Sequence, residues 1–219
     1  VEIVGALRYD YFSDGSQSNV TPKLNLRYRP TRRLTLRAGY GMGFRAPTLK
    51  EKYYNFDMVG IWIVEGNKDL KAEKSHNFNL SAEYVRGHYD FTASVYYNLV
   101  HNKLSTAAPY FKSATDKLPY LPYANLDNYS VCGGEVGVQA RWDNGLSARL
   151  TYAYTKEHLP KDKEGNTINN QYIPAREHAL NVRADYDHRF SKHYALSLGI
   201  NGRAMSGTSN VEYKNYYDV

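Results

Sequence analysis

The stretch GMGFRAPTLKEKYYNF, residues 41–56, changes character halfway along its length. It begins as a strand in which small and large residues alternate, and it then enters a polar segment rich in Tyr and Lys. Pro47 has no amide to donate to a β-ladder, so strand pairing is expected to end there. The segments before and after this stretch indicate which fold contains a strand followed by such a long polar loop.

Alternation of apolar and polar residues recurs along the whole chain. In residues 34–42 the large apolar side chains fall on one parity, while Thr, Arg and Gly fall on the other. Runs of this kind predict strands with one apolar face and one polar face. The predicted strands cover residues 1–11, 22–29, 33–44, 75–86, 88–102, 129–142, 146–157, 176–189 and 193–205, and a tenth begins near Val211.

Short and long connections alternate between the predicted strands. Tight turns are predicted at residues 31–32, 86–87, 143–145 and 191–192, and long polar loops at residues 12–21, 45–74, 103–128 and 158–175. In an up-and-down meander, every second connection lies at the same end of the sheet. All short turns therefore gather at one end and all long loops at the other, as in outer-membrane barrels with short periplasmic turns and long extracellular loops.

A soluble β-sandwich or soluble barrel would show the same period of two, so this alternative has to be weighed. Several predicted strands are about ten residues long, which is the length that crosses a bilayer at a tilt. The chain holds 22 Tyr in 219 residues, and aromatic residues near strand ends are typical of membrane interfaces. The predicted girdle residues are Tyr9, Tyr28, Tyr40, Tyr84, Trp142, Tyr154 and Tyr186. These features favour the membrane barrel.

Composition excludes several other classes of protein. The net charge is +6, but Lys and Arg are scattered without a basic cluster or a nucleic-acid motif, so no nucleic-acid partner is expected. Cys132 is the single cysteine, which excludes an internal disulfide framework. The sequence opens in mid-strand without a signal peptide and is expected to be a fragment of a longer protein.

Two segments of the sequence resemble the barrel signature of TonB-dependent outer-membrane receptors. They are GFRAPTLKEKYY, residues 43–54, and GNKDLKAEKSHNFNLSAEY, residues 66–84. The family shows G-[FY]-R-A-P-x-L-x-E-L-[YF] and then G-N-P-x-L-K-P-E-x-S-x-N-x-E. Lys68 and Ala72 stand where the family often has Pro, and Lys52 stands where it often has an apolar residue. The resemblance implies a structural role for Gly43, Phe44, Arg45, Ala46, Pro47, Leu49, Glu51, Gly66, Asn67, Leu70, Glu73 and Ser75.

The resemblance implies an all-β, antiparallel up-and-down transmembrane barrel of roughly 22 strands, filled by a plug. Residues 1–219 are then expected to be nine or ten strands of a single barrel domain, with the plug domain and the final strands absent. The implied function is import of a scarce ligand across the outer membrane of a Gram-negative bacterium. The ligand is expected to be an iron complex, a ferric siderophore or haem, with cobalamin as the alternative.

The implied partners follow from the same resemblance. They are the TonB complex, acting through the absent plug and TonB box, the small-molecule cargo, and outer-membrane lipid. No intrinsic cofactor is expected. A passive porin-like channel and a glycan importer of the same family remain as alternatives. An enzyme is disfavoured because the sequence has no nucleophile elbow, metal-ligand spacing or phosphate loop.

Candidate ligand-binding residues lie in two of the long loops. The loop between the two family motifs holds no His, but it offers aromatic and sulfur-containing side chains. Tyr can ligate haem iron, and Tyr and Trp can stack on a flat ligand, although the same side chains can simply pack the loop. The candidates are Tyr53, Tyr54, Met58 and Trp62 in one loop and Tyr120 and Tyr123 in another. For His76, His101, His158 and His178, a plain surface role and a metal or haem role both stay open.

Overall fold

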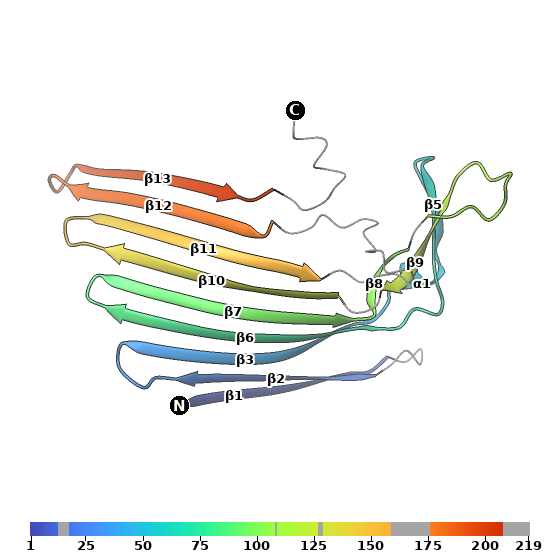
Figure 1. Ribbon diagram of the computed structural model, residues 1–219, viewed down its shortest axis with the longest axis horizontal. Coiled ribbons are helices and arrows are strands. Elements are labelled where there is room, and N and C mark those ends of the chain that lie inside the picture. Colours follow the sequence, from blue (N-terminus) through green and yellow to red (C-terminus); the bar gives the residue numbers. More distant parts are fainter. Residues whose placement is uncertain (13–17, 108, 127–128, 159–175, 208–219) are drawn as a thin grey trace.

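The computed structural model describes residues 1–12, 18–107, 109–126, 129–158 and 176–207. A large antiparallel sheet runs through most of the molecule, and a smaller sheet lies beyond one end of its strands (Figure 1). No helix among these described residues is long and apolar enough to cross a membrane.

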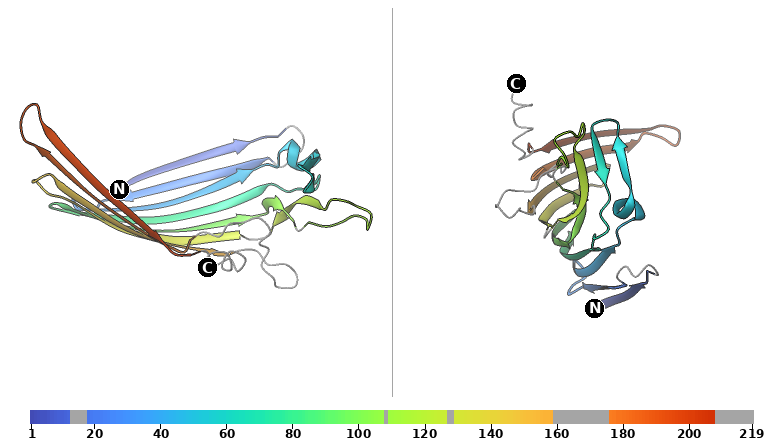
Figure 2. Two further views of the ribbon diagram at one scale, coloured as in Figure 1. Left: turned by 90° about the horizontal axis from the view of Figure 1, so that it is seen from above. Right: turned by 90° about the vertical axis from the view of Figure 1, so that its right-hand side faces the viewer.

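Nine strands form the large sheet, and every neighbouring pair is antiparallel. In spatial order they are β1 (Glu2–Asp10), β2 (Asn19–Tyr28), β3 (Leu34–Arg45), β6 (Glu73–Arg86), β7 (Tyr89–His101), β10 (Tyr129–Arg141), β11 (Leu146–His158), β12 (His178–Arg189) and β13 (Ala195–Met205). Spatial order follows chain order, which confirms the predicted meander. The sheet is curved but not closed (Figure 2).

The predicted strand boundaries need two corrections. β2 begins at Asn19 rather than residue 22, because Asn19 still pairs with Asp10 across the hairpin. The predicted loop 12–21 is therefore shorter than expected. β6 begins at Glu73, where pairing with Arg45 already holds the strand. The tenth strand predicted near Val211 lies outside the described residues.

The predicted tight turns connect the strands at one end of the large sheet (Figure 1). Gly87 and Gly145 adopt φ values of 58° and 88°, a backbone conformation that glycine reaches without steric cost. The turn between β2 and β3 is held differently, because the Thr31 hydroxyl accepts hydrogen bonds from the amides of Arg33 and Leu34 at 3.2 and 3.1 Å. The described ends of β1, β3, β7 and β11, where the long connections leave the sheet, lie at the opposite end, which we call the loop end (Figure 1).

The cross-strand register separates the large sheet into an apolar face and a polar face. One row of the apolar face is Leu26, Ala38, Leu80 and Val95, on β2, β3, β6 and β7. The adjacent row of the polar face is Asn25, Gly39, Asn79 and Tyr96. The Asn79 amide lies 2.7 Å from the place where a Cβ on Gly39 would be, so any other residue at position 39 would displace that side chain.

Ion pairs and hydrogen bonds follow the polar face. The Arg37 guanidinium lies 2.8 Å from the Glu83 carboxylate on the neighbouring strand. Arg183 pairs with Asp185 on its own strand at 2.8 Å. These exposed contacts orient the side chains and contribute little stability individually.

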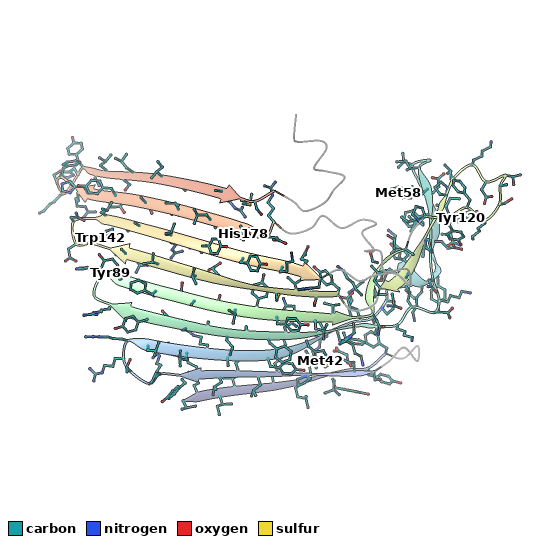
Figure 3. The ribbon with its side chains drawn as sticks, in the orientation of Figure 1. Met42, Met58, Tyr89, Tyr120, Trp142 and His178 are labelled. Carbon is teal, nitrogen blue, oxygen red and sulfur yellow. The ribbon has the colours of Figure 1, made fainter. Side chains whose placement is uncertain are left out.

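Aromatic side chains form two bands on the apolar face, one near each end of the strands. The band at the turn end contains Tyr28, Tyr84, Tyr89, Trp142 and Tyr186, and the band at the loop end contains Tyr9, Tyr40, Phe78, Tyr97 and Tyr154. Tyr89 and Trp142 pack edge to face with ring centroids 6.2 Å apart (Figure 3). All seven predicted girdle residues lie in these bands.

The long connections 45–74 and 103–128, predicted as polar loops, contain regular structure. They hold α1 (Leu49–Tyr53), β4 (Asn55–Met58), β5 (Trp62–Glu65), β8 (Lys103–Thr106) and β9 (Tyr120–Leu126). The four strands form a second sheet in the order β4-β5-β9-β8, which we call the loop sheet. β5 and β9 pair in parallel although they are far apart in sequence. Runs of four residues are too short for periodicity to distinguish them from loops, which explains why β4, β5 and β8 were missed.

Candidate functional site

The end of β3 leads directly into a capped helical turn. Thr48 is the N-cap of α1, and its hydroxyl accepts a hydrogen bond from the Glu51 amide at 3.2 Å. The Glu51 carboxylate in return accepts from the Thr48 amide at 2.7 Å. This reciprocal capping box satisfies two backbone donors that a helix start would leave unpaired. Pro47 precedes the cap, so strand pairing ends at Arg45 as the sequence predicts.

Arg45 joins this helical turn to the start of the next strand. Its guanidinium lies 2.9 Å from the Glu51 carboxylate and 3.9 Å from that of Glu73. Glu73 also accepts a hydrogen bond from the Leu104 amide at 2.9 Å. We call Arg45, Glu51 and Glu73 the rim clamp, because together they connect β3, α1, β6 and β8 at the loop end of the sheet.

The second family motif packs on the first. The Asn67 amide donates to the Glu51 carbonyl at 2.9 Å, and the Gly66 amide donates to the Asn55 side chain at 3.0 Å. A Cβ on Gly66 would lie 2.8 Å from the Tyr53 nitrogen, so the chain approaches α1 more closely than any other residue allows. Gly66 therefore has a packing role in this structure.

The same motif also anchors the loop sheet. The Asn67 side chain donates to the Tyr123 carbonyl at 3.0 Å. Asn125 exchanges hydrogen bonds with the backbone of Lys71 at 2.7 and 2.9 Å. Leu70 and Ala72 lie between these contacts and are buried. Residues 66–72 therefore join the two long connections into one structure beyond the loop end of the large sheet.

The remaining motif residues occupy varied positions. Phe44 packs against Phe12 with ring centroids 5.8 Å apart. The Ser75 hydroxyl lies where a Cβ on Gly43 would be, and it accepts a hydrogen bond from Asn77 at 3.3 Å. Ala46 and Pro47 are half-buried, whereas Leu49 is exposed on α1.

The candidate ligand-binding residues lie on several elements of the rim: α1, the β4–β5 hairpin and β9. Tyr53 and Tyr54 are exposed at the end of α1, and the Lys68 ammonium lies 5.8 Å from the Tyr53 ring centroid. The Trp62 indole donates to the Met58 sulfur at 3.1 Å on the β4–β5 hairpin. Met58 on β4 and Tyr120 on β9 lie in the loop sheet, beyond the loop end of the large sheet (Figure 3). Tyr123 is half-buried in β9 and contributes its carbonyl to the anchor described above.

Sequence reasoning missed a polar cluster beside Tyr120. The Tyr110 hydroxyl and the Lys112 ammonium both donate to the Glu65 carboxylate, at 2.8 and 2.6 Å. The Lys112 ammonium also lies 4.1 Å from the Tyr120 ring centroid. No local sequence pattern predicts this cluster, because Glu65 and Lys112 come from different long connections. The loop sheet therefore presents aromatic and cationic side chains together.

Hydrogen bonds shift the pKa of both loop carboxylates downward. Partial burial raises the pKa of Glu51, but hydrogen bonds from the Thr48 amide and from Arg45 together outweigh it, and the net pKa lies below the ordinary value. The hydrogen bond from Lys112 is the main cause that lowers the pKa of Glu65; burial opposes it and the Tyr110 hydroxyl adds to it. Both interactions therefore favour the ionised carboxylate.

The four candidate histidines, His76, His101, His158 and His178, lie on the apolar face of the large sheet near its loop end. The Tyr40 hydroxyl and the His76 Nδ1 atom are 2.9 Å apart, and the Tyr152 hydroxyl and the His178 Nδ1 atom are 2.7 Å apart. His76 and His101 pack edge to face at 5.9 Å. Within the described part of the chain, no three His, Cys, Asp or Glu side chains are placed to hold a metal ion.

These features define a class of protein: the wall of an up-and-down β-barrel with an elaborated rim at one end. The family model described as TonB dependent receptor-like, beta-barrel matches residues 1–219. The chain belongs to this family, as the two sequence motifs predict.

Two curated relatives are similar in sequence. The iron-regulated outer membrane virulence protein of Vibrio cholerae is 25% identical over 193 residues, which cover 82% of this chain and 28% of that protein. The hemoglobin-haptoglobin-binding protein A of Haemophilus influenzae is 30% identical over 150 residues, which cover 64% of this chain and 14% of that protein. The chain thus spans less than a third of the length of these relatives.

Solved structures show the same fold. The siderophore receptor PirA of Pseudomonas aeruginosa superposes with a TM-score of 0.72 at 21% identity, over 94% of this chain and 37% of that chain. A mutant of the ferric enterobactin receptor of Pseudomonas aeruginosa, in complex with enterobactin, superposes with a TM-score of 0.67 at 24% identity. That match covers 91% of this chain and 30% of that chain.

Proposed function

We propose that this chain is part of the barrel of an outer-membrane receptor that imports an iron complex, either a ferric siderophore or haem. The observation that supports this proposal is the ordered structure of the rim, which consists of α1 and the loop sheet at the loop end of the large sheet. The rim clamp and residues 66–72 anchor an aromatic loop sheet beyond the loop end of the large sheet. A passive pore has no need of such a platform, whereas a receptor has to capture its ligand before import. The iron-related names of the relatives support an iron complex.

The membrane placement follows from the two faces of the large sheet. The apolar face contacts lipid, and its two aromatic bands lie at the two interfaces of the outer membrane of a Gram-negative bacterium. The polar face lines the interior of the barrel. The short turns then lie in the periplasm and the loop sheet lies outside the cell. Residues 1–219 belong to a single barrel domain in this proposal.

The receptor obtains energy from the TonB complex, which acts through the plug domain and TonB box of the whole receptor. The iron complex is cargo and not a resident cofactor, and the protein has no catalytic role. Within the loop sheet and α1, the residues proposed to contact the cargo are Tyr53, Tyr54, Met58, Trp62, Tyr120 and Tyr123.

Growth of a deletion strain tests the cargo. The full-length gene is deleted or restored under iron limitation, and haem, ferric siderophores or cobalamin are supplied one at a time. We expect loss of growth on one iron source, rescued by the gene only when TonB is present. Rescue without TonB would favour a passive channel, a defect on cobalamin alone would favour that cargo, and no defect on any source would favour a glycan importer.

The contact residues are tested in the restored strain. Tyr53→Ala and Trp62→Ala are expected to weaken binding of the cargo, each by about five- to thirtyfold, because an aromatic contact with a ligand is worth roughly 1–2 kcal/mol. Tyr28→Ala at the turn end is the matched control, since it removes the same side chain far from the loop sheet. Equal binding by all three variants would contradict a role for these aromatics.

A further inference from the structure

The charged side chains on the apolar face are distributed unevenly. Among the described residues of the nine strands, no Asp or Glu lies on the parity of this face. Its Lys, Arg and His side chains lie only near the strand ends. At the loop end these are Lys74, His76, His101, Lys156, His158 and His178, and at the turn end Arg86 and His188. The loop end of this face is therefore selectively basic.

Three of these basic residues form a compact group on two central strands. Lys74 on β6 is directly opposite His101 on β7. The rings of His76 and His101 are 5.9 Å apart, and the Tyr40 hydroxyl contacts the Nδ1 atom of His76 at 2.9 Å. Lys74 has no ion pair with any carboxylate of the described residues. We call Lys74, His76 and His101 the basic triplet.

The side chains change in character along the strands below the basic triplet. The next row toward the turn end is aromatic and contains Tyr40, Phe78 and Tyr97, with Tyr40 and Phe78 5.0 Å apart. Beyond it, the face is hollowed into a shallow apolar groove, where the small side chains of Ala38, Ala82 and Ala93 lie among Leu36, Leu80 and Val95. Basic, aromatic and apolar groups therefore follow one another in the order of a lipid headgroup, interface and acyl chain.

The spacing of these rows matches one leaflet of a membrane. Lys74 and Leu80 are six positions apart on β6, which corresponds to about 20 Å along a strand. At a strand tilt of about 45° this places the groove roughly 14 Å below the basic triplet, close to half of the ~30 Å hydrocarbon thickness. The groove thus lies where the acyl chains of a lipid bound at the basic triplet would reach.

We propose that this surface is a binding site for a phosphorylated lipid of the outer leaflet. The basic triplet donates hydrogen bonds to a headgroup phosphate, since ammonium and imidazole groups are donors and no carboxylate of this face repels the anion. The aromatic row contacts the glycan or glycerol region, and the groove holds an acyl chain. The site rests on the proposed membrane placement but is independent of the identity of the cargo.

The test uses the full-length receptor purified from outer membranes and stripped of lipid in detergent. Native mass spectrometry measures binding of lipid A, a glycolipid with phosphates on its sugar headgroup, and of the same lipid after dephosphorylation. We expect wild type to prefer the phosphorylated form. Lys74→Ala and His101→Ala are each expected to reduce that affinity about fivefold, since each basic group near an anionic headgroup contributes roughly 1 kcal/mol, while Lys74→Arg retains it.

Two further variants distinguish binding of the lipid headgroup from binding of its acyl chain. Ala82→Phe fills the groove and is expected to weaken both lipids alike, whereas Arg86→Ala, at the turn end of the same strand, is expected to change neither. Equal binding of the two lipids by wild type, or an equal loss in Arg86→Ala, would overturn the site. Dimerisation through this face in place of lipid binding would also overturn it. Absence of the receptor from the outer-membrane fraction would instead contradict the proposed function.

Discussion

At the scale of single residues, Glu51 has more partners than its place in a short surface helix suggests. Its carboxylate accepts hydrogen bonds from the Thr48 amide and from Arg45, and its carbonyl accepts from the Asn67 amide. The family motif accounts for the presence of a carboxylate here, but only the structure shows that one residue caps α1, pairs with β3 and receives the second motif.

Replacement of Glu51 by Gln tests this role. The neutral amide weakens the capping box and the contact with Arg45, so we expect the rim to lose about 1–2 kcal/mol of local stability. Hydrogen exchange in the full-length receptor is the measurement, with faster exchange expected at the Thr48 and Asn67 amides. Asp143→Asn, a change of the same kind in an exposed turn at the other end, is the control. Unchanged protection of both amides would argue against the rim clamp.

Gly66 gives a second prediction at this scale. In Gly66→Ala the new Cβ would lie 2.8 Å from the Tyr53 nitrogen and 2.9 Å from the Lys52 carbonyl carbon, so α1 has to move. Overpacking of this kind typically costs about 1–3 kcal/mol. Limited proteolysis near Tyr53 is expected to become faster, whereas Gly5→Ala, where nothing lies within 4 Å, is expected to behave as wild type. Equal proteolysis of both variants would show that the close approach is not required.

At the scale of elements, the loop sheet depends on contacts between two long connections. Glu65 on β5 accepts hydrogen bonds from Tyr110 and Lys112, which precede β9. Periodicity could not predict these strands, because β4, β5 and β8 have four residues each and β5 pairs in parallel with a distant segment. The six candidate ligand residues lie in the two long connections, and their placement relative to one another depends on this nonlocal pairing.

The loop sheet is expected to loosen in acid. The folded-state pKa of Glu65 is lowered, chiefly by Lys112, so its stabilising contribution is complete above the unfolded pKa near 4.5. That contribution is lost as the pH falls through the still lower folded pKa. The protection factors of the amides of residues 109–112, which correct for the intrinsic pH dependence of hydrogen exchange, are expected to fall below about pH 4.5. Glu65→Gln is expected to remove this pH dependence, and its persistence in the variant would assign it to other groups.

At the scale of the whole molecule, the two faces of the large sheet predict opposite tolerances to charge. Val95 lies on the apolar face between Leu80 and Gly134, and Ser94 lies on the polar face between Ser81 and Glu135. If the apolar face contacts lipid, Val95→Arg costs about 2–4 kcal/mol near the bilayer midplane. In Ser94→Arg, by contrast, the new guanidinium lies on the polar face next to the Glu135 carboxylate.

The yield of folded full-length receptor in the outer membrane measures this difference. We expect a marked loss for Val95→Arg and near-normal yield for Ser94→Arg. Because the two positions are adjacent on one strand, they share the same backbone environment and differ only in face. Equal yields of the two variants would contradict the placement of lipid against the apolar face.

The sequence alone determined the nine strands, their antiparallel order, the division into two faces and the family. These features are local or repetitive: period-two alternation, turn residues and two motifs can be read without knowing which segments meet. The tertiary structure decided how the rim is built. Arg45 meets Glu73 and Gly66 approaches Tyr53 because the connection between β3 and β6 folds back on itself. Glu65 meets Lys112 because the chain returns to the same end of the sheet after β6 and β7. Contacts between residues far apart in sequence leave no periodic signal, and this is why the rim needed the structure.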